Sequence, residues 1–83
     1  MSEKKPSEKA IVGQFLRTVR EREGLTQTEL GRAASMGQDA IARAEADEGP
    51  LPRLDNIREI LAGAGYDLQL RAIKKSTTIE TTI

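Results

Sequence analysis

The chain has 83 residues, and its 13 basic and 13 acidic side chains cancel to a net charge of zero at pH 7. It contains no cysteine and no histidine, which excludes disulfides, Cys/His zinc sites and catalysis by a histidine base or a cysteine nucleophile. No apolar run approaches the roughly 20 residues of a membrane-spanning helix, and the N-terminus lacks the apolar core of a signal peptide. We therefore expect one small cytoplasmic domain that is not an enzyme and has no metal, cofactor or membrane partner.

The charges are distributed unevenly along the chain. Residues 1–25 hold six basic and four acidic side chains, residues 26–49 hold two and five, and residues 50–83 hold five and four. Affinity for nucleic acid usually depends on basic side chains that neutralise phosphates. The acidic middle segment therefore counts against a nucleic-acid surface in that part of the chain.

Residues 1–6 are polar and predict a flexible arm ahead of a domain over residues 7–65. The first helix is expected to begin after Ser7, a favoured N-cap residue, and to run to about Glu23, where Gly24 ends it. Apolar residues at three- and four-residue steps predict its buried face, which comprises Ile11, Val12, Phe15, Leu16 and Val19. The basic residues predicted on its outer side are Lys9, Arg17 and Arg20.

Residues 26–46 indicate two short helices that meet at a tight corner. Thr26 and Glu29 have the spacing of a capping box, which predicts the start of a helix over residues 27–34. The stretch 35–37 then breaks the pattern, and a second helix is expected over residues 38–46. Small residues on the predicted inner faces, which allow the helix axes to approach closely, are Ala33, Ala34, Ala40 and Ala44. Spacing alone fits both a helix-turn-helix and an ordinary helical hairpin.

Two prolines and a glycine predict a loop over residues 47–52, and a fourth helix is expected to begin near Arg53. Its predicted inward residues are Leu54, Ile57, Ile60, Leu61 and Ala64. Residues 66–72 then alternate strictly between apolar and polar, which predicts a half-buried strand within a dimerisation segment over residues 66–74. The predicted dimerisation residues are Tyr66, Leu68, Leu70 and Ala72.

A single strand cannot satisfy its own backbone groups, so this one must pair with another strand. The simplest partner is the same strand of a second copy, antiparallel across a twofold axis. Residues 75–83 have high strand propensity but little hydrophobic content, and they predict either a flexible tail or a strand that a partner orders.

Three motifs together resemble the Xre family of lambda-repressor/Cro-like helix-turn-helix proteins. They are R-E-R-E-G-L-T-Q-T-E-L at residues 20–30, I-A-R-A-E at residues 41–45 and P-R-L-D-N-I-R-E-I-L-A-G-A-G at residues 52–65. The additional strand is similar to that of HipB-type antitoxins. The resemblance implies an all-α domain of four to five helices with one C-terminal strand that pairs across a dimer. It also implies a repressor of its own toxin–antitoxin operon, whose partners are an operator palindrome in double-stranded DNA and a HipA-like toxin kinase, and which is nucleoid-associated when bound to its operator.

The resemblance assigns roles to residues at matching positions. Gln27 would contact a phosphate and support the recognition helix, and Glu45 would serve the scaffold. The positions expected to face base edges or phosphates on the second helix of the motif are Gly37, Gln38, Asp39, Ala42 and Arg43. Further phosphate contacts are expected from Arg53 and from Arg17 or Arg20.

Three positions depart from the family pattern. Ser35 stands where the family usually has a glycine in the turn, and Gly37 replaces the usual Ser or Thr cap. Asp39 places an acid among the base-reading positions, where it either accepts a hydrogen bond from cytosine N4 or simply favours the helix N-terminus. Two alternatives to the antitoxin therefore stay open: a protein-interaction module that no longer binds DNA, and a phage-type repressor.

Overall fold

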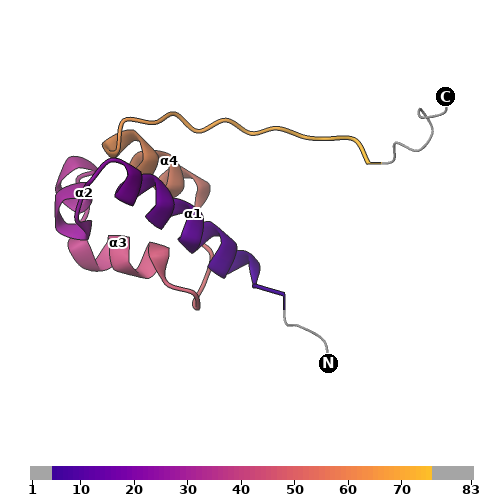
Figure 1. Cartoon of the computed structure of the whole chain (residues 1–83), viewed down its shortest axis with the longest axis horizontal. Coiled ribbons are helices and arrows are strands. Elements are labelled where there is room, and N and C mark those ends of the chain that lie inside the picture. The colour runs from indigo at the N-terminus through magenta and orange to yellow at the C-terminus, as the bar shows by residue number, and fades with distance from the viewer. Residues whose placement is uncertain (1–4, 76–83) are drawn as a thin grey trace.

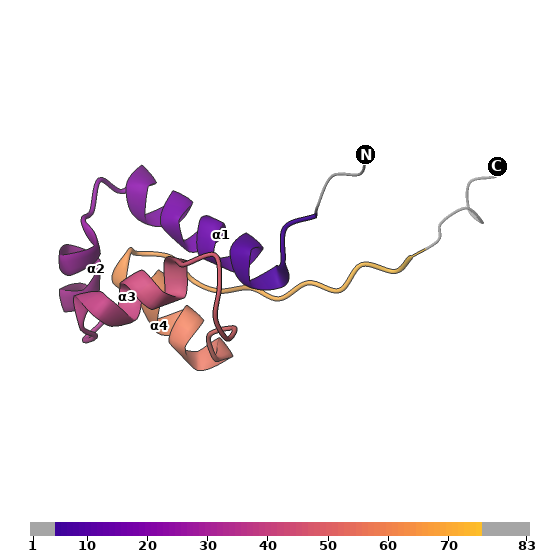
Figure 2. The ribbon, with the colours of Figure 1, turned by 90° about the horizontal axis from the view of Figure 1, so that it is seen from below.

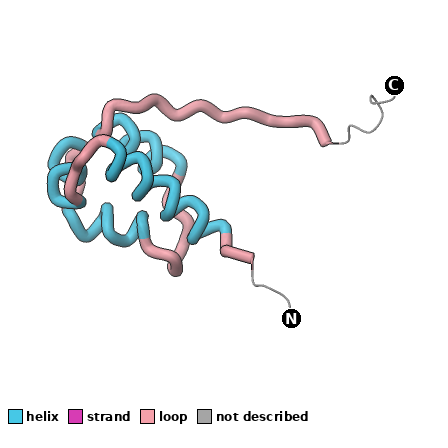
Figure 3. Tube along the Cα trace, viewed as in Figure 1, coloured by secondary structure: helices cyan, strands magenta, loops and turns pink. Residues whose placement is uncertain are grey.

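The computed structural model describes residues 5–75 and contains four helices in that range (Figure 1). They are α1 (Glu8–Arg22), α2 (Gln27–Ala33), α3 (Gln38–Glu45) and α4 (Leu54–Gly63). The predicted all-α helix-turn-helix fold is confirmed with four helices, and over residues 5–75 no strand is present (Figure 3). None of the helices in this range is long and apolar enough to cross a membrane.

Local hydrogen bonds explain where the first two helices begin. The Ser7 hydroxyl accepts a hydrogen bond from the Ala10 amide at 3.0 Å, which caps α1. At the start of α2, the Thr26 hydroxyl accepts from the Glu29 amide at 3.0 Å, while the Glu29 carboxylate accepts from the Thr26 amide at 2.9 Å. The predicted N-cap and capping box are therefore confirmed.

The four helices surround one small core. Its buried apolar side chains are Leu16, Leu30, Ile41, Ala44, Ile60 and Leu61, so every helix contributes. Two predicted core residues of α1 lie elsewhere: Ile11 is 54% exposed and Phe15 is 50% exposed. The prediction was wrong for this pair because the apolar stripe of α1 is wider than the surface that the other helices cover.

Glycines allow the closest helix contacts, in place of the alanines that were predicted to do so. A Cβ on Gly31 of α2 would lie 2.8 Å from the Met36 carbonyl oxygen, and a Cβ on Gly13 of α1 would lie 2.6 Å from the Glu45 carbonyl oxygen. Ala33, which was expected to face inward, is exposed. The end of α3 thus lies directly against α1, and the turn that precedes α3 lies directly against α2.

The turn between α2 and α3 contains a strained residue. Ser35 has a φ of 60°, in the left-handed region that disfavours side chains with a Cβ. Ser35 stands at the position where the Xre family, which the sequence resembles, usually carries glycine. The corner therefore keeps its geometry although the residue that suits it best is missing.

We expect Ser35→Gly to raise the free energy of unfolding by about 0.5–1 kcal/mol, because the relief of strain exceeds the added entropy of the unfolded chain. Thermal denaturation should show a Tm that is higher by about 2–8 °C. The matched control is Ala34→Gly, at a φ of −92°, which should lower the Tm. A Ser35→Gly protein less stable than the parent would contradict the strain.

The segment after α4 is extended but is not a strand within the described residues. It leaves the helices and runs outward, as two perpendicular views show (Figures 1 and 2). Tyr66 and Leu68 are half-buried against the core, whereas Leu70 and Ala72 are exposed. The Tyr66 hydroxyl donates to the Glu23 carboxylate at 2.7 Å. The predicted alternation of burial is thus present only at the beginning of the segment, because no strand within residues 5–75 pairs with the rest.

Candidate nucleic-acid interface

Helix α3 has one buried and one exposed side. Ile41, Ala44 and Glu45 are buried against α1, α2 and the core. The opposite side, formed largely by predicted interface residues, presents Gly37, Gln38, Asp39 and Arg43 as exposed and Ala42 as half-buried. The structure therefore brings these five predicted residues together on an accessible helix surface. Gly37 caps α3 without a side-chain hydrogen bond.

A chain of amide hydrogen bonds connects this surface to the interior. The Gln27 Nε2 donates to Glu45 Oε1 at 3.1 Å, and the Gln38 Nε2 donates to Gln27 Oε1 at 2.8 Å. Because an ionised carboxylate only accepts, Glu45 determines which way the Gln27 amide points. The Gln38 amide is oriented in turn, and its Oε1 and its second N–H remain available to a ligand.

The chain of hydrogen bonds ends in a buried ion pair. Arg20 donates from Nε to Glu45 Oε2 at 2.7 Å and from Nη2 to Glu45 Oε1 at 2.9 Å. Its Nη1 donates to the Leu25 carbonyl oxygen at 2.8 Å. The Glu45 side chain is only 1% exposed, which confirms its predicted role in the scaffold. Three of the five N–H groups of Arg20 are thus bonded inside the fold, and its side chain is only 12% exposed, while its suggested phosphate contact stays a prediction.

The ionisation of the pair follows from its surroundings. Burial raises the pKa of the Glu45 carboxyl. Hydrogen bonds from Arg20 and Gln27, together with the charges of Arg20 and Arg17, lower that pKa by more, so it lies below the ordinary value of 4.5. The hydrogen bond with Glu45 raises the pKa of Arg20 against the opposing effect of burial. Both groups are therefore charged at neutral pH. Arg17, whose Nε lies 3.9 Å from Glu45 Oε1, is partly exposed, and its phosphate contact stays a prediction.

Lys9 supports the other end of α3, a role that was not predicted. Its ammonium donates to the carbonyl oxygens of Arg43 at 3.0 Å and Ala44 at 3.1 Å, and also to that of Ala46. These carbonyls end α3, where a positive charge is favoured. Lys9 was expected on the outer side of α1 but is only 6% exposed. The signal that could have located it is its spacing, four residues before the buried Gly13.

Asp39 and Arg43 neutralise each other on the exposed side of α3. Arg43 Nη1 lies 3.2 Å from Asp39 Oδ2, and both side chains are largely exposed. The hydrogen bond and charge of Arg43 lower the pKa of Asp39, and backbone amides at the start of α3 lower it further. This geometry is what an acid at a helix N-terminus requires, and it leaves the carboxylate accessible to a base edge as well.

Arg53 lies near Arg43 although ten residues separate them. Both line a groove between α3, the loop 47–52 and α4. Arg53 directly precedes α4, and its Nη2 lies 3.3 Å from Asp55 Oδ2 at an exposed position. The two residues predicted to contact phosphates therefore line one groove, and each is accompanied by a carboxylate.

Comparison with protein-family models agrees with this geometry. A model described as a helix-turn-helix domain matches residues 11–72, which include all of α2, α3 and α4. The chain belongs to this helix-turn-helix family. No curated protein matches the chain at a significant level.

Family membership indicates a DNA-binding regulator. In the observed fold, α2 and α3 are the two short consecutive helices joined by a tight turn, as in a helix-turn-helix. In this helix-turn-helix protein, the turn over residues 34–37 joins α2 to α3, which is the second helix of the pair. Within residues 5–75 no cluster of three or more potential metal ligands is present. The exposed surface of α3 is therefore the candidate interface with DNA.

Proposed function

We propose that this protein is a homodimeric, sequence-specific transcriptional repressor that places α3 in the major groove of an operator palindrome. The observation that carries the proposal is the orientation of Gln38. Its amide is held by Gln27, which is itself held by the buried Glu45, so a polar side chain at the start of the recognition helix is preorganised. A side chain that only stabilised the fold would not need a free donor and a free acceptor on the exposed side.

The free groups of Gln38 match one base. Adenine offers N7 as an acceptor and N6 as a donor in the major groove, and glutamine binds both in a bidentate manner. Asp39 accepts from cytosine N4 in the same proposal. Gln27, Arg17, Arg43 and Arg53 contact phosphates, and the small Gly37 and Ala42 let the backbone of α3 approach the duplex.

The proposed dimer follows from the shape of an operator. Two recognition helices read half-sites about 34–36 Å apart, one turn of DNA, when a twofold axis relates the proteins. Among residues 5–75 the segment after Tyr66 makes no backbone–backbone hydrogen bond, and Leu70 on it is exposed. This supports pairing between copies, because the backbone groups and Leu70 are available to a second chain. A monomer would bind the operator through one recognition helix and one half-site only.

We expect Gln38→Ala to weaken binding to the preferred operator by about 1–3 kcal/mol while changing little on operators with another base at that position. Fluorescence anisotropy with a set of single-base operator variants measures this difference. Gln14→Ala, on the exposed side of α1, is the matched control. Equal loss on every operator variant would contradict a base-reading role for Gln38.

The repressor proposal itself is tested by binding to DNA from upstream of its own gene. A specific shift with one dimer per palindrome, weakened by added salt, supports it. The acidic segment 26–49 favours the alternative of a protein-interaction module on a helix-turn-helix scaffold. A dimer that binds no such DNA more tightly than random DNA would support that alternative.

The narrower proposal is that the repressor is an antitoxin that binds a HipA-like kinase. Its support is the similarity of the segment after α4 to HipB-type antitoxins. Copurification with a kinase encoded by the neighbouring gene, and relief of that kinase's toxicity, tests it. Neighbouring phage genes without a kinase would favour a phage-type repressor.

A further inference from the structure

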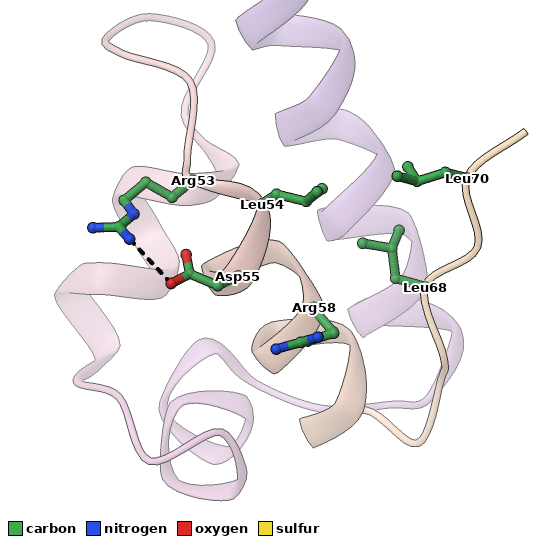
Figure 4. A pocket seen from close by; sticks show the side chains of 6 residues that line it. All are labelled: Arg53, Leu54, Asp55, Arg58, Leu68 and Leu70. Carbon is green, nitrogen blue, oxygen red and sulfur yellow. Dashed lines mark hydrogen bonds and ion pairs between the residues drawn. The ribbon is translucent and has the colours of Figure 1, made fainter. Parts of the chain in front are cut away.

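A groove with apolar walls runs between α4 and the segment that follows it (Figure 4). The residues that line it are Arg53, Leu54, Asp55, Arg58, Leu68 and Leu70. Leu54 and Leu70 point toward one another across the groove, yet they are 52% and 73% exposed (Figure 4). Leucines on both walls therefore remain in contact with water in the single chain.

The backbone along one wall of this groove pairs with no other part of residues 5–75. Among residues 5–75, the last backbone–backbone hydrogen bond of the segment is donated by the Tyr66 amide to the Leu61 carbonyl oxygen. Beyond it, the side chains of Asp67, Gln69 and Arg71 are exposed on the side opposite Leu68. An extended edge with free amides and carbonyls is a template for pairing with another strand.

We propose that a second copy of the chain occupies this groove, with the two segments antiparallel about a twofold axis at Gln69. The inference rests on the homodimer proposed above and specifies its register. In this register Leu68 lies opposite the partner's Leu70, and Leu70 lies opposite the partner's Leu68. Four leucines then cover the apolar walls that a single chain leaves exposed.

Side-chain direction limits the possible registers. Residues directly opposite each other in an antiparallel pair point to the same face, so a shift by one residue places leucines opposite polar side chains. Only axes that pass through a residue keep Leu68 and Leu70 of both copies on one face. The central candidates for the axis are therefore positions 68, 69 and 70.

Charge selects among these three positions. With the axis at Gln69, Asp67 lies opposite the partner's Arg71, and symmetry forms this ion pair twice. An axis at Leu70 places Asp67 opposite the partner's Ile73, and an axis at Leu68 places Arg71 opposite the partner's Gly65. Opposite charges that face each other across strands stabilise the pairing. With the axis at Leu68 or at Leu70, Asp67 and Arg71 do not face each other and this ion pair is lost.

Single cysteines test the register, because the natural chain contains none. The variants are Leu68→Cys, Gln69→Cys and Leu70→Cys in the full-length protein under mild oxidation. A residue on the axis faces itself at a Cα separation of about 4.5–5.5 Å, which suits a disulfide, while its neighbours face their own copies at roughly 7–8 Å. We expect the Gln69→Cys protein to form covalent dimers at least about tenfold faster than the other two.

Charge reversal supplies a second measurement that does not depend on cysteine reactivity. Asp67→Arg and Arg71→Asp should each weaken the dimer by about tenfold in sedimentation experiments, and the double variant should restore it. Fastest crosslinking at position 68 or 70, no crosslinking at any position, or a double variant weaker than both singles would overturn the register. Operator binding is measured separately: a dimer crosslinked at position 69 that ignores DNA would refute the repressor and leave this inference standing.

Discussion

Glu45→Gln is expected to lower the free energy of unfolding by about 3–5 kcal/mol, because Arg20 then stays buried without a counter-charge. The Glu45 carboxylate accepts two hydrogen bonds from Arg20 and one from Gln27. A glutamine side chain is neutral and has only one acceptor oxygen, so it cannot replace these bonds or the charge. Small domains are stable by only about 5–15 kcal/mol, so this is a large fraction of the total. Urea denaturation at pH 7 measures the loss.

The same substitution is expected to remove part of the acid sensitivity of the protein. Because the pKa of Glu45 in the folded protein lies below 4.5, its contribution is complete above pH 4.5 and is lost as the pH falls through the folded value. The stability difference between parent and variant should therefore narrow below pH 4.5. Glu59→Gln, at an exposed position of α4, is the matched control and should change stability by less than about 0.5 kcal/mol. A difference that stays constant from pH 7 to pH 3 would contradict the ion pair's role.

Leu70→Asp is expected to produce folded monomers and to weaken operator binding by roughly 100-fold or more, because two linked recognition helices bind far more tightly than one. Leu70 is 73% exposed in the single chain, so its replacement leaves the core intact. Substitution of Leu68 is less informative, since that side chain packs against the core and its loss also destabilises the fold. Sedimentation gives the oligomeric state, and anisotropy gives the affinity.

The control for added negative charge is Gln14→Glu, which places one more carboxylate on the exposed side of α1. It should leave both the dimer and operator binding close to those of the parent. Circular dichroism and thermal denaturation establish that each variant is folded. A Leu70→Asp protein that remains dimeric would show that the segment after α4 is not the interface.

Much of the helix-turn-helix could be predicted from local chemistry. Ser7 and the Thr26–Glu29 capping box begin their helices where hydrogen bonds to free amides predict, and the helical spacing of Leu16 and Ile60 correctly identifies core positions. The four helices follow from such signals, whereas the helix-turn-helix fold and the family were expected from the resemblance of three sequence motifs. These signals act between residues a few positions apart, so they can be recognised without knowledge of the tertiary structure.

The partners of the charged residues on α1 could not be predicted in this way. Lys9 and Arg20 were expected on the outer side of α1, although they lie seven residues before and four residues after the buried Leu16. Their spacing does not reveal that carbonyls and a carboxylate of α3 meet them. The same limit explains Phe15, which has the spacing of a core residue but no helix that covers it.

By itself, the sequence determined the helices, their caps and the turn, because each depends on bonding between near neighbours in the chain. Only the tertiary structure decided that Lys9 and Arg20 are internal, that glycines make the closest contacts and that Gln38 is oriented through Gln27. The physical reason is that burial and ion pairing depend on residues that are distant in the chain and adjacent in space.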